Sequence, residues 1–144
     1  MYRPLCHSTT HLYNIKMKKN NIIYWLTTGI ISLMMVFSAF MYLTNPEIEV
    51  AFQHLGFPSF FRVELAWAKV LAAGILIIPF IPVRVKEWAY AGLGIVFVSA
   101  TIAHIVNGDA VSMVISPLVF LGILVVSNIY LHKRTAGNEL KNVY

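Results

Sequence analysis

The chain has a single cysteine and few charged residues, and each shortage excludes a kind of protein. Cys6 is the only cysteine among 144 residues, so the chain can form no intramolecular disulfide, CxxC redox pair or thiolate metal cluster. Charged side chains account for 12% of the residues and hydrophobic side chains for 58%, a balance outside the range of soluble globular domains. Together with a mean hydropathy of +0.72, this composition predicts a membrane protein.

Motifs of catalysis and nucleotide binding are missing as well. The sequence contains no Gly-rich phosphate loop, no paired-carboxylate hydrolase site and no serine triad. A bis-histidine haem needs two facing histidines at one membrane depth, and His104 has no such companion, because His54 falls in a link and His132 at the opposite face. The net charge of +5 comes from short basic flanks between apolar runs, which does not indicate nucleic-acid binding. We therefore expect no catalytic residues, no metal site, no nucleic-acid partner and no autonomous enzymatic activity.

Four apolar segments are long enough to cross a hydrocarbon core, which takes roughly 20 residues. They comprise residues 22–43, 60–81, 88–106 and 111–131. Each is expected to be helical, because a single segment in lipid must satisfy its own backbone hydrogen bonds. Pro79 falls in the last turn of the second segment and Pro117 near the start of the fourth, where a helix tolerates proline. Because the connections are short, we expect an all-α integral membrane protein built as an antiparallel four-transmembrane-helix bundle.

The link between the first two spans carries helix signals of its own. In "TNPEIEVAFQHLGFP", residues 44–58, Asn45 can cap a helix and Pro46 suits its first position. Glu47 and Glu49 favour the positive end of the helix dipole, and Gly56 can end the helix. One face would then hold Ile48, Ala51, Phe52 and Leu55. We expect a short amphipathic helix at the membrane surface or over the mouth of the bundle.

The distribution of basic residues predicts the orientation. Nine of the eleven lysines and arginines flank span ends on one side of the membrane, namely Arg3, Lys16, Lys18, Lys19, Arg84, Lys86, Lys133, Arg134 and Lys141. Under the positive-inside rule both termini are cytoplasmic, so residues 1–21 and 132–144 form cytoplasmic tails around a transmembrane domain of residues 22–131. Aromatic side chains near the span ends fit interface belts, namely Tyr24, Trp25, Tyr42, Trp88, Tyr90 and Tyr130. Met17, followed by two lysines, is a candidate start, which would make residues 1–16 an upstream extension.

Lys69 is the charged residue that lies deepest in a predicted span. It comes about nine residues into the second span, roughly 13 Å along the helix and near the middle of a 30 Å core. An ionised lysine at that depth costs at least a few kcal/mol, so it should face the bundle or a wet cavity. Ala66, Ala72 and Ala73 share its face, and such small residues allow a neighbouring helix to approach. The alternative is that Lys69 snorkels toward the surface or binds backbone carbonyls, with no ligand.

Other polar residues gather between Lys69 and the outer boundary of the bundle. Arg62 shares the face of Lys69, whereas Glu64 lies about 140° around the helix and cannot pair with Lys69 without strain. Glu64 and His104 are expected at similar depth, which predicts a contact between them; the alternative for His104 is a bond to a backbone carbonyl. The candidate ligand-binding residues are Lys69, Glu64, His104, Arg62 and Asp109, with His54 from the link as a further candidate. No other intramembrane acid is available to Lys69, which leaves room for an anionic or carbonyl-bearing ligand such as a quinone or a lipid head group.

The middle of the chain resembles a known family. The resemblance is carried by the Leu-Gly-Phe-Pro turn at residues 55–58, Lys69, "KEWAYAG" at residues 86–92, and Ser99-Ala100 and His104 near the end of the third span. This pattern is similar to the DoxX-like branch of the DoxX family and extends from about residue 18 to about residue 133. Residues 1–16 have no place in it.

The resemblance implies a small bacterial inner-membrane protein with four transmembrane helices. Family relatives are associated with quinone-linked oxidoreductase complexes and with membrane assemblies that handle oxidative or thiol stress, but the resemblance supplies no catalytic residues. Our leading hypothesis is a non-catalytic membrane subunit that supports a redox partner and holds a quinone at Lys69. The alternatives are a small carrier or lipid-binding protein whose polar site takes an amphiphile, and a purely structural bundle. The sequence leaves the oligomeric state open.

Overall fold

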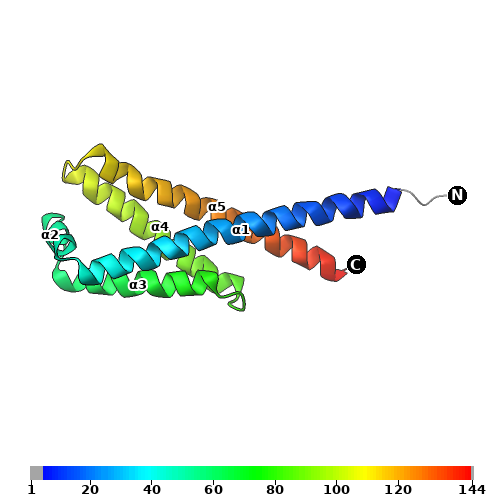
Figure 1. Ribbon diagram of the computed structural model, residues 1–144, viewed down its shortest axis with the longest axis horizontal. Coiled ribbons are helices and arrows are strands. Elements are labelled where there is room, and N and C mark those ends of the chain that lie inside the picture. The colour runs from blue at the N-terminus through cyan, green and yellow to red at the C-terminus, as the bar shows by residue number, and fades with distance from the viewer. Residues whose placement is uncertain (1–4, 144) are drawn as a thin grey trace.

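The computed structural model describes residues 5–143 of the chain, with side chains over residues 15–138. All regular secondary structure in this part is helical, as the sequence predicts (Figure 1). The helices are α1 (Leu5–Thr44), α2 (Pro46–His54), α3 (Ser59–Ile77), α4 (Val83–Val106) and α5 (Val111–Val143). The side chains of Arg3, Cys6 and Lys141 lie outside the described residues.

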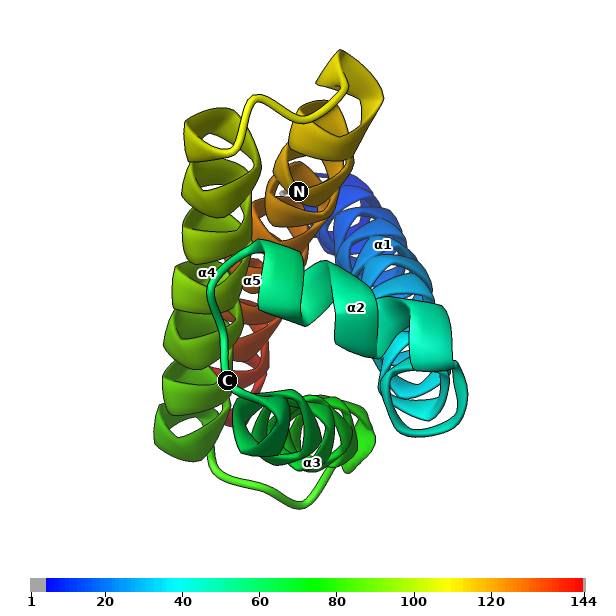
Figure 2. The ribbon, with the colours of Figure 1, turned by 90° about the vertical axis from the view of Figure 1, so that its left-hand side faces the viewer.

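The helix α2 is the short helix predicted between the first two long ones. Asn45 caps it, because its side-chain oxygen accepts a hydrogen bond from the backbone N–H of Glu47 at 2.9 Å. Pro46 lies in its first turn, and Gly56 follows it with a φ of +79°, a left-handed conformation that glycine adopts at little cost. Phe52 is the buried residue of its apolar face. Figure 2 shows α2 lying across one end of the bundle, which we call the α2 end; the opposite end, toward the chain termini, is the terminus end.

Three of the described helices are long and apolar enough to cross a membrane. They lie in residues Ile15–Thr44, Val83–Val106 and Val111–Asn138. The helix α3 has 19 residues, which is long enough, but it is not among them because it carries three charged residues, Arg62, Glu64 and Lys69. The helices α1, α4 and α5 are thus candidate membrane spans by length and composition, whereas the three charged residues of α3 set it apart from them.

The connection between α3 and α4 differs from the prediction at both of its ends. The helix α3 ends at Ile77, not at residue 81, and Ile78 has an extended backbone with φ of −70° and ψ of 119°. The reason is that a residue before a proline is pushed out of the helical region, so Pro79 ends α3 instead of lying in its last turn. The helix α4 begins at Val83, five residues before the predicted start of the third span, with Pro82 as its N-cap residue.

The first and last helices of the chain, α1 and α5, extend well past the predicted spans. The segments expected as tails continue α1 back to Leu5 and α5 on to Val143. At 1.5 Å per residue α1 is about 60 Å long, twice the thickness of a hydrocarbon core. The two extensions approach closely, because a Cβ added at Gly137 would overlap the sulfur of Met17.

The long helices form two pairs that diverge toward the α2 end. The helix α1 packs along α3, and α4 packs along α5. Contacts between α1 and α5, and fewer between α3 and α4, join the pairs. In Figures 1 and 2 the α4–α5 pair separates from the α1–α3 pair at the α2 end and meets it toward the terminus end. The hydrophobic core includes Tyr24, Ile31, Met35, Leu76, Leu93, Phe97, Leu124 and Leu131.

Candidate functional site

A cavity of about 900 Å³ lies between the helices at the α2 end. All five helices contribute to its wall, and most of the lining side chains are apolar. The polar lining side chains are Ser38, Tyr42, Lys69, Ser99, His104, Ser112 and Ser116. The volume falls in the range of small-molecule sites, roughly 300–1,000 Å³, and such sites combine apolar walls with a few polar groups.

Lys69 is the charged group inside this cavity. Its exposed fraction is 4%, and Ala66 and Ala73 on the same face of α3 are buried as well. The prediction that Lys69 faces the interior of the bundle is therefore confirmed. Its Nζ donates a hydrogen bond to Oγ of Ser38 at 3.0 Å and lies 3.6 Å from the ring centroid of Tyr42, a cation–π arrangement.

The hydrogen bonding of Lys69 leaves donor capacity toward the cavity. An ammonium group has three N–H donors and no acceptor. Ser38 accepts one of them and the face of Tyr42 attracts the charge, while no acidic side chain among the described residues pairs with Lys69. A ligand with a hydrogen-bond-accepting head can therefore bind Lys69 without breaking an existing ion pair.

A cluster of four aromatic rings lines the cavity on the side covered by α2. The rings of Tyr42 and Phe52 meet edge to face at 5.0 Å, and Phe52 lies 6.0 Å from Phe57. Phe57 in turn stacks on Phe61 at 5.1 Å. All four side chains line the cavity, so α2 is held over it by ring contacts with α1 and with the start of α3.

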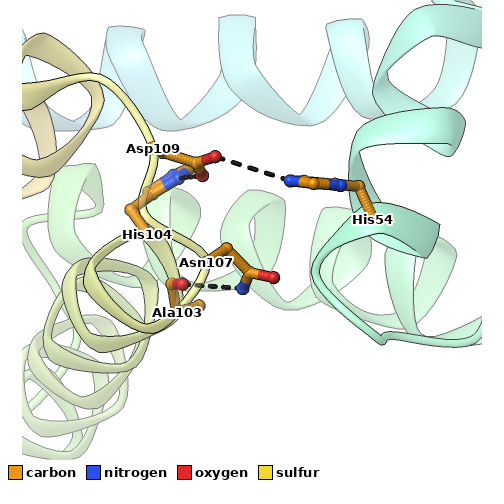
Figure 3. Close-up of polar contacts among 5 residues, drawn as sticks. All are labelled: His54, Ala103, His104, Asn107 and Asp109. Atoms are coloured by element: carbon orange, nitrogen blue, oxygen red, sulfur yellow. Dashed lines mark hydrogen bonds and ion pairs between the residues drawn. The ribbon is translucent and has the colours of Figure 1, made fainter.

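Three polar residues form a bridge at the α2 end, here called the histidine bridge: His54, His104 and Asp109 (Figure 3). His104 donates from Nδ1 to Oδ2 of Asp109 at 2.6 Å, and Nε2 of His54 lies 3.5 Å from the other carboxylate oxygen. The hydrogen bond with His104 holds the pKa of Asp109 below its usual value, and the nearby histidine charges act in the same direction. The bridge connects α2 to the link between α4 and α5.

Arg62 and Glu64 do not join this bridge. Arg62 pairs with Glu49 of α2, with Nη2 and Oε2 3.1 Å apart, and also donates to the backbone carbonyl of Tyr42. Glu64 is exposed and makes no ion pair with any described residue. The predicted contact between Glu64 and His104 is therefore wrong, because Glu64 lies on the face of α3 turned away from Lys69 and the interior, and His104 binds Asp109. Of the candidate residues, the structure places Lys69 and His104 in the cavity wall, while Arg62 and Asp109 contact the lining residues Tyr42 and His104.

Pro117 interrupts the hydrogen bonding of α5 beside the cavity. It has no N–H group, so the carbonyl of Met113 cannot receive the usual bond from four residues later. Pro117 is buried, and both residues line the cavity. Proline in a membrane helix is tolerated where other groups or a cavity satisfy the freed carbonyl.

Lys86 is a buried lysine that the sequence interpretation missed. The sequence places it among the basic residues that flank the span ends, yet its exposed fraction is 3%. Its Nζ donates to the carbonyl of Leu76 at 3.0 Å and to the hydroxyl of Tyr24 at 3.2 Å. Leu76 lies in the last turn of α3, where carbonyls have no partner in their own helix, so Lys86 caps that end. The sequence signal for this cap is Pro79, because a proline ends the helix before it and has no N–H group for the carbonyl of Ile75 in the last turn.

A hydroxyl cluster at the terminus end was also not predicted. Thr28 and Ser127 share a hydrogen bond of 2.7 Å, and Tyr90 and Ser127 share one of 2.6 Å. All three side chains are buried, and they come from α1, α4 and α5.

The expectation that Tyr24 and Tyr90 belong to an interface belt is wrong, because both are buried in the bundle. Trp88, in contrast, is 81% exposed, as a belt residue should be.

The fold and the cavity define an all-helical membrane protein with a buried, cationic, largely apolar site between its helices. The particular family is known: the chain belongs to the DoxX-like family, whose model matches residues 26–127. Every residue that lines the cavity falls inside the matched region. In comparisons with curated proteins and with solved structures, nothing matches the chain.

Proposed function

We propose that the chain is a non-catalytic membrane subunit that holds one lipophilic molecule in the cavity, with the polar head of that molecule on Lys69. The observation that carries the proposal is a buried lysine that faces an apolar cavity without an acidic partner among the described residues. An intramembrane charge of this kind is costly unless it serves a ligand or a pathway. A bound acceptor group would offset part of that cost.

A quinone is the leading ligand. Its carbonyl oxygens accept hydrogen bonds, which suits the free donor capacity of Lys69, and its flat ring suits the aromatic cluster that roofs the cavity. The apolar walls suit an isoprenoid tail. In this proposal the chain supports a quinone-linked oxidoreductase or an oxidative-stress assembly as an accessory, and the redox chemistry belongs to the partner.

The proposed topology has four membrane spans with both termini cytoplasmic, in a bacterial cytoplasmic membrane. It is supported by the three apolar helices and by the concentration of basic residues at the terminus end. The helix α3 would be the fourth span, because Lys69 is buried in the bundle and Arg62 is paired with Glu49 near the end of the helix. A tag on the C-terminus should then be inaccessible from outside the cell, and an accessible tag contradicts this orientation.

A second candidate function is that of a carrier for a lipid or another amphiphile, with no redox partner. It is favoured by the openness of the cavity wall toward the surface of the bundle. Phe37, Ile95 and Met113 line the cavity, and their exposed fractions are 57%, 67% and 52%. In a bilayer such residues face lipid, so a molecule can pass sideways between the cavity and the membrane.

The experiment that tests binding is mass spectrometry of the lipids and quinones retained by the protein in mild detergent. The test variant is Lys69→Met, and the matched control is Lys133→Met, which removes an exposed lysine at the terminus end. We expect the wild type and the control to retain the same ligand, and Lys69→Met to lose it by at least tenfold. Equal retention by Lys69→Met contradicts the proposal. A retained quinone supports the redox subunit, and a retained lipid alone supports the carrier.

A further inference from the structure

The two helix pairs are joined by polar contacts of different character at their two ends. At the terminus end, Lys86 binds the carbonyl of Leu76, and Ser127 joins α5 to α1 through Thr28; these side chains are buried. At the α2 end, within the part of the chain that the structure describes, Asp109 beside the α4–α5 pair forms an ion pair with His54 of α2, and α2 is joined to the α1–α3 pair by the ion pair of Glu49 with Arg62. Among the described residues, buried polar contacts therefore join the pairs at the terminus end, whereas a single exposed polar contact does so at the α2 end.

The contact at the α2 end is built to be reversible. The side chain of His54 is 62% exposed and its distance to Asp109 is 3.5 Å, which is typical of a weak surface ion pair. Asp109 itself is held in place by the shorter bond to His104. Figure 3 shows the imidazole of His54 reaching from α2 across a gap to the carboxylate of Asp109. This contact is not part of the packing of α1 on α3 or of α4 on α5.

We propose that the molecule is a clamp, in which the helix pairs hinge at the terminus end and His54 with Asp109 forms a clasp that closes the cavity when His54 is protonated. The inference rests on the proposed function, because it concerns access to the same cavity. Ile48, Phe52 and Leu55 line the cavity from α2 and the turn after it, so a shift of α2 relative to α4 and α5 alters its mouth. The clasp sets how easily a ligand enters from the α2 end.

The direction of the pH effect follows from the charges at this end. A histidine side chain carries a charge when it is protonated. Asp109 is ionised from pH 5 to pH 8, because the bond with His104 holds its pKa below the ordinary value of 3.8. A proton on His54 therefore strengthens the attraction across the clasp, and its loss leaves a neutral imidazole beside the Asp109 carboxylate. The other ionisable groups on the neighbouring elements are His104 on α4, Glu47 and Glu49 on α2, and Arg62 and Glu64 on α3. Arg62 and Glu49 neutralise each other by pairing.

The test measures the distance between the helix pairs as a function of pH. Spin labels are placed on Thr44→Cys at the end of α1 and Val111→Cys at the start of α5, both exposed positions, in a Cys6→Ser background. The full chain is reconstituted in lipid nanodiscs without added ligand. The distance between the two labels is measured by double electron–electron resonance at pH 5 and pH 8. We expect the ratio of the short to the long distance population to be about 1.4- to fivefold higher at pH 5, the range for an exposed ion pair.

Three variants decide the outcome. His54→Ala should give the pH 8 distribution at both pH values, and His54→Lys, which stays charged, should give the pH 5 distribution at both. His132→Ala is the matched control, since His132 pairs with Glu87 at 3.3 Å at the terminus end and should keep the full response. A wild type that does not respond to pH, or a response that survives in His54→Ala, overturns the clasp. Because no ligand is used, such a result leaves the Lys69 site standing, and loss of ligand in the retention experiment leaves the clasp standing.

Discussion

Replacing Lys86 by methionine is expected to destabilise the bundle, whereas the same replacement at Lys69 is not. The ammonium of Lys86 makes two hydrogen bonds, to the carbonyl of Leu76 and to the hydroxyl of Tyr24. Hydrogen bonds to a charged group contribute about 1.5–3 kcal/mol each. The cost of burying the charge offsets part of this, so Lys86→Met should lose about 2 kcal/mol of unfolding free energy. In Lys69→Met the bond to Ser38 and the cation–π contact with Tyr42 are lost, but the cost of burying the charge disappears as well. A serine in a helix can also bond to its own backbone instead, so the net loss should stay below about 1 kcal/mol.

The measurement is reversible unfolding in mixed micelles, followed by circular dichroism as the fraction of denaturing detergent rises. Both variants remove one buried lysine and introduce the same side chain, so each is the control for the other. The reasoning is refuted if Lys69→Met is destabilised as much as Lys86→Met, because Lys69 would then be a structural lysine. A stable Lys69→Met protein that has lost its ligand separates binding from folding at this site.

Three other substitutions have expected outcomes. Asp109→Asn should remove a pH-dependent part of the stability. The hydrogen bond with His104 lowers the pKa of Asp109, so the stabilisation is present above the ordinary pKa of 3.8 and is lost as the pH falls below that value. Unfolding of the wild type and of the variant, measured over a series of acidic pH values, checks this. Ser127→Ala should cost about 1–3 kcal/mol in the same micelle assay, since it leaves two buried hydroxyl partners with one bond fewer. Pro117→Ala should raise the midpoint of thermal unfolding by restoring the bond to the carbonyl of Met113, and an unchanged midpoint would mean that this carbonyl is already satisfied.

Local signals allowed part of the structure to be predicted from the sequence. The cap at Asn45, the proline after it and the glycine at the end fixed α2, because each acts within a few residues. The inward direction of Lys69 followed from the helical period, which placed alanines on the same face. These features depend on neighbours along one helix, and a single segment contains the information for them.

The missed features depend on contacts between segments. The carbonyl that Lys86 binds belongs to another helix, and its need for a partner arises from the end of α3 ahead of Pro79. The predicted contact between Glu64 and His104 was based on equal depth, but depth does not fix the angle of one helix about its axis relative to another. The bond between His54 and Asp109 also depends on how α2 lies across the bundle, which hydropathy does not determine.

The extensions of α1 and α5 have a mechanical consequence for the cavity at the opposite end. The two helices belong to different pairs, contact each other and cross in Figure 1. Gly137 of α5 lies against Met17 of α1. Because α1 and α5 cross in contact, a movement that spreads their terminal segments would also change the separation of the helix pairs at the α2 end. A change in the separation of these extensions would therefore alter the spacing of the helix pairs around Lys69, which lies roughly 30 Å away along α1, without any contact at the cavity itself.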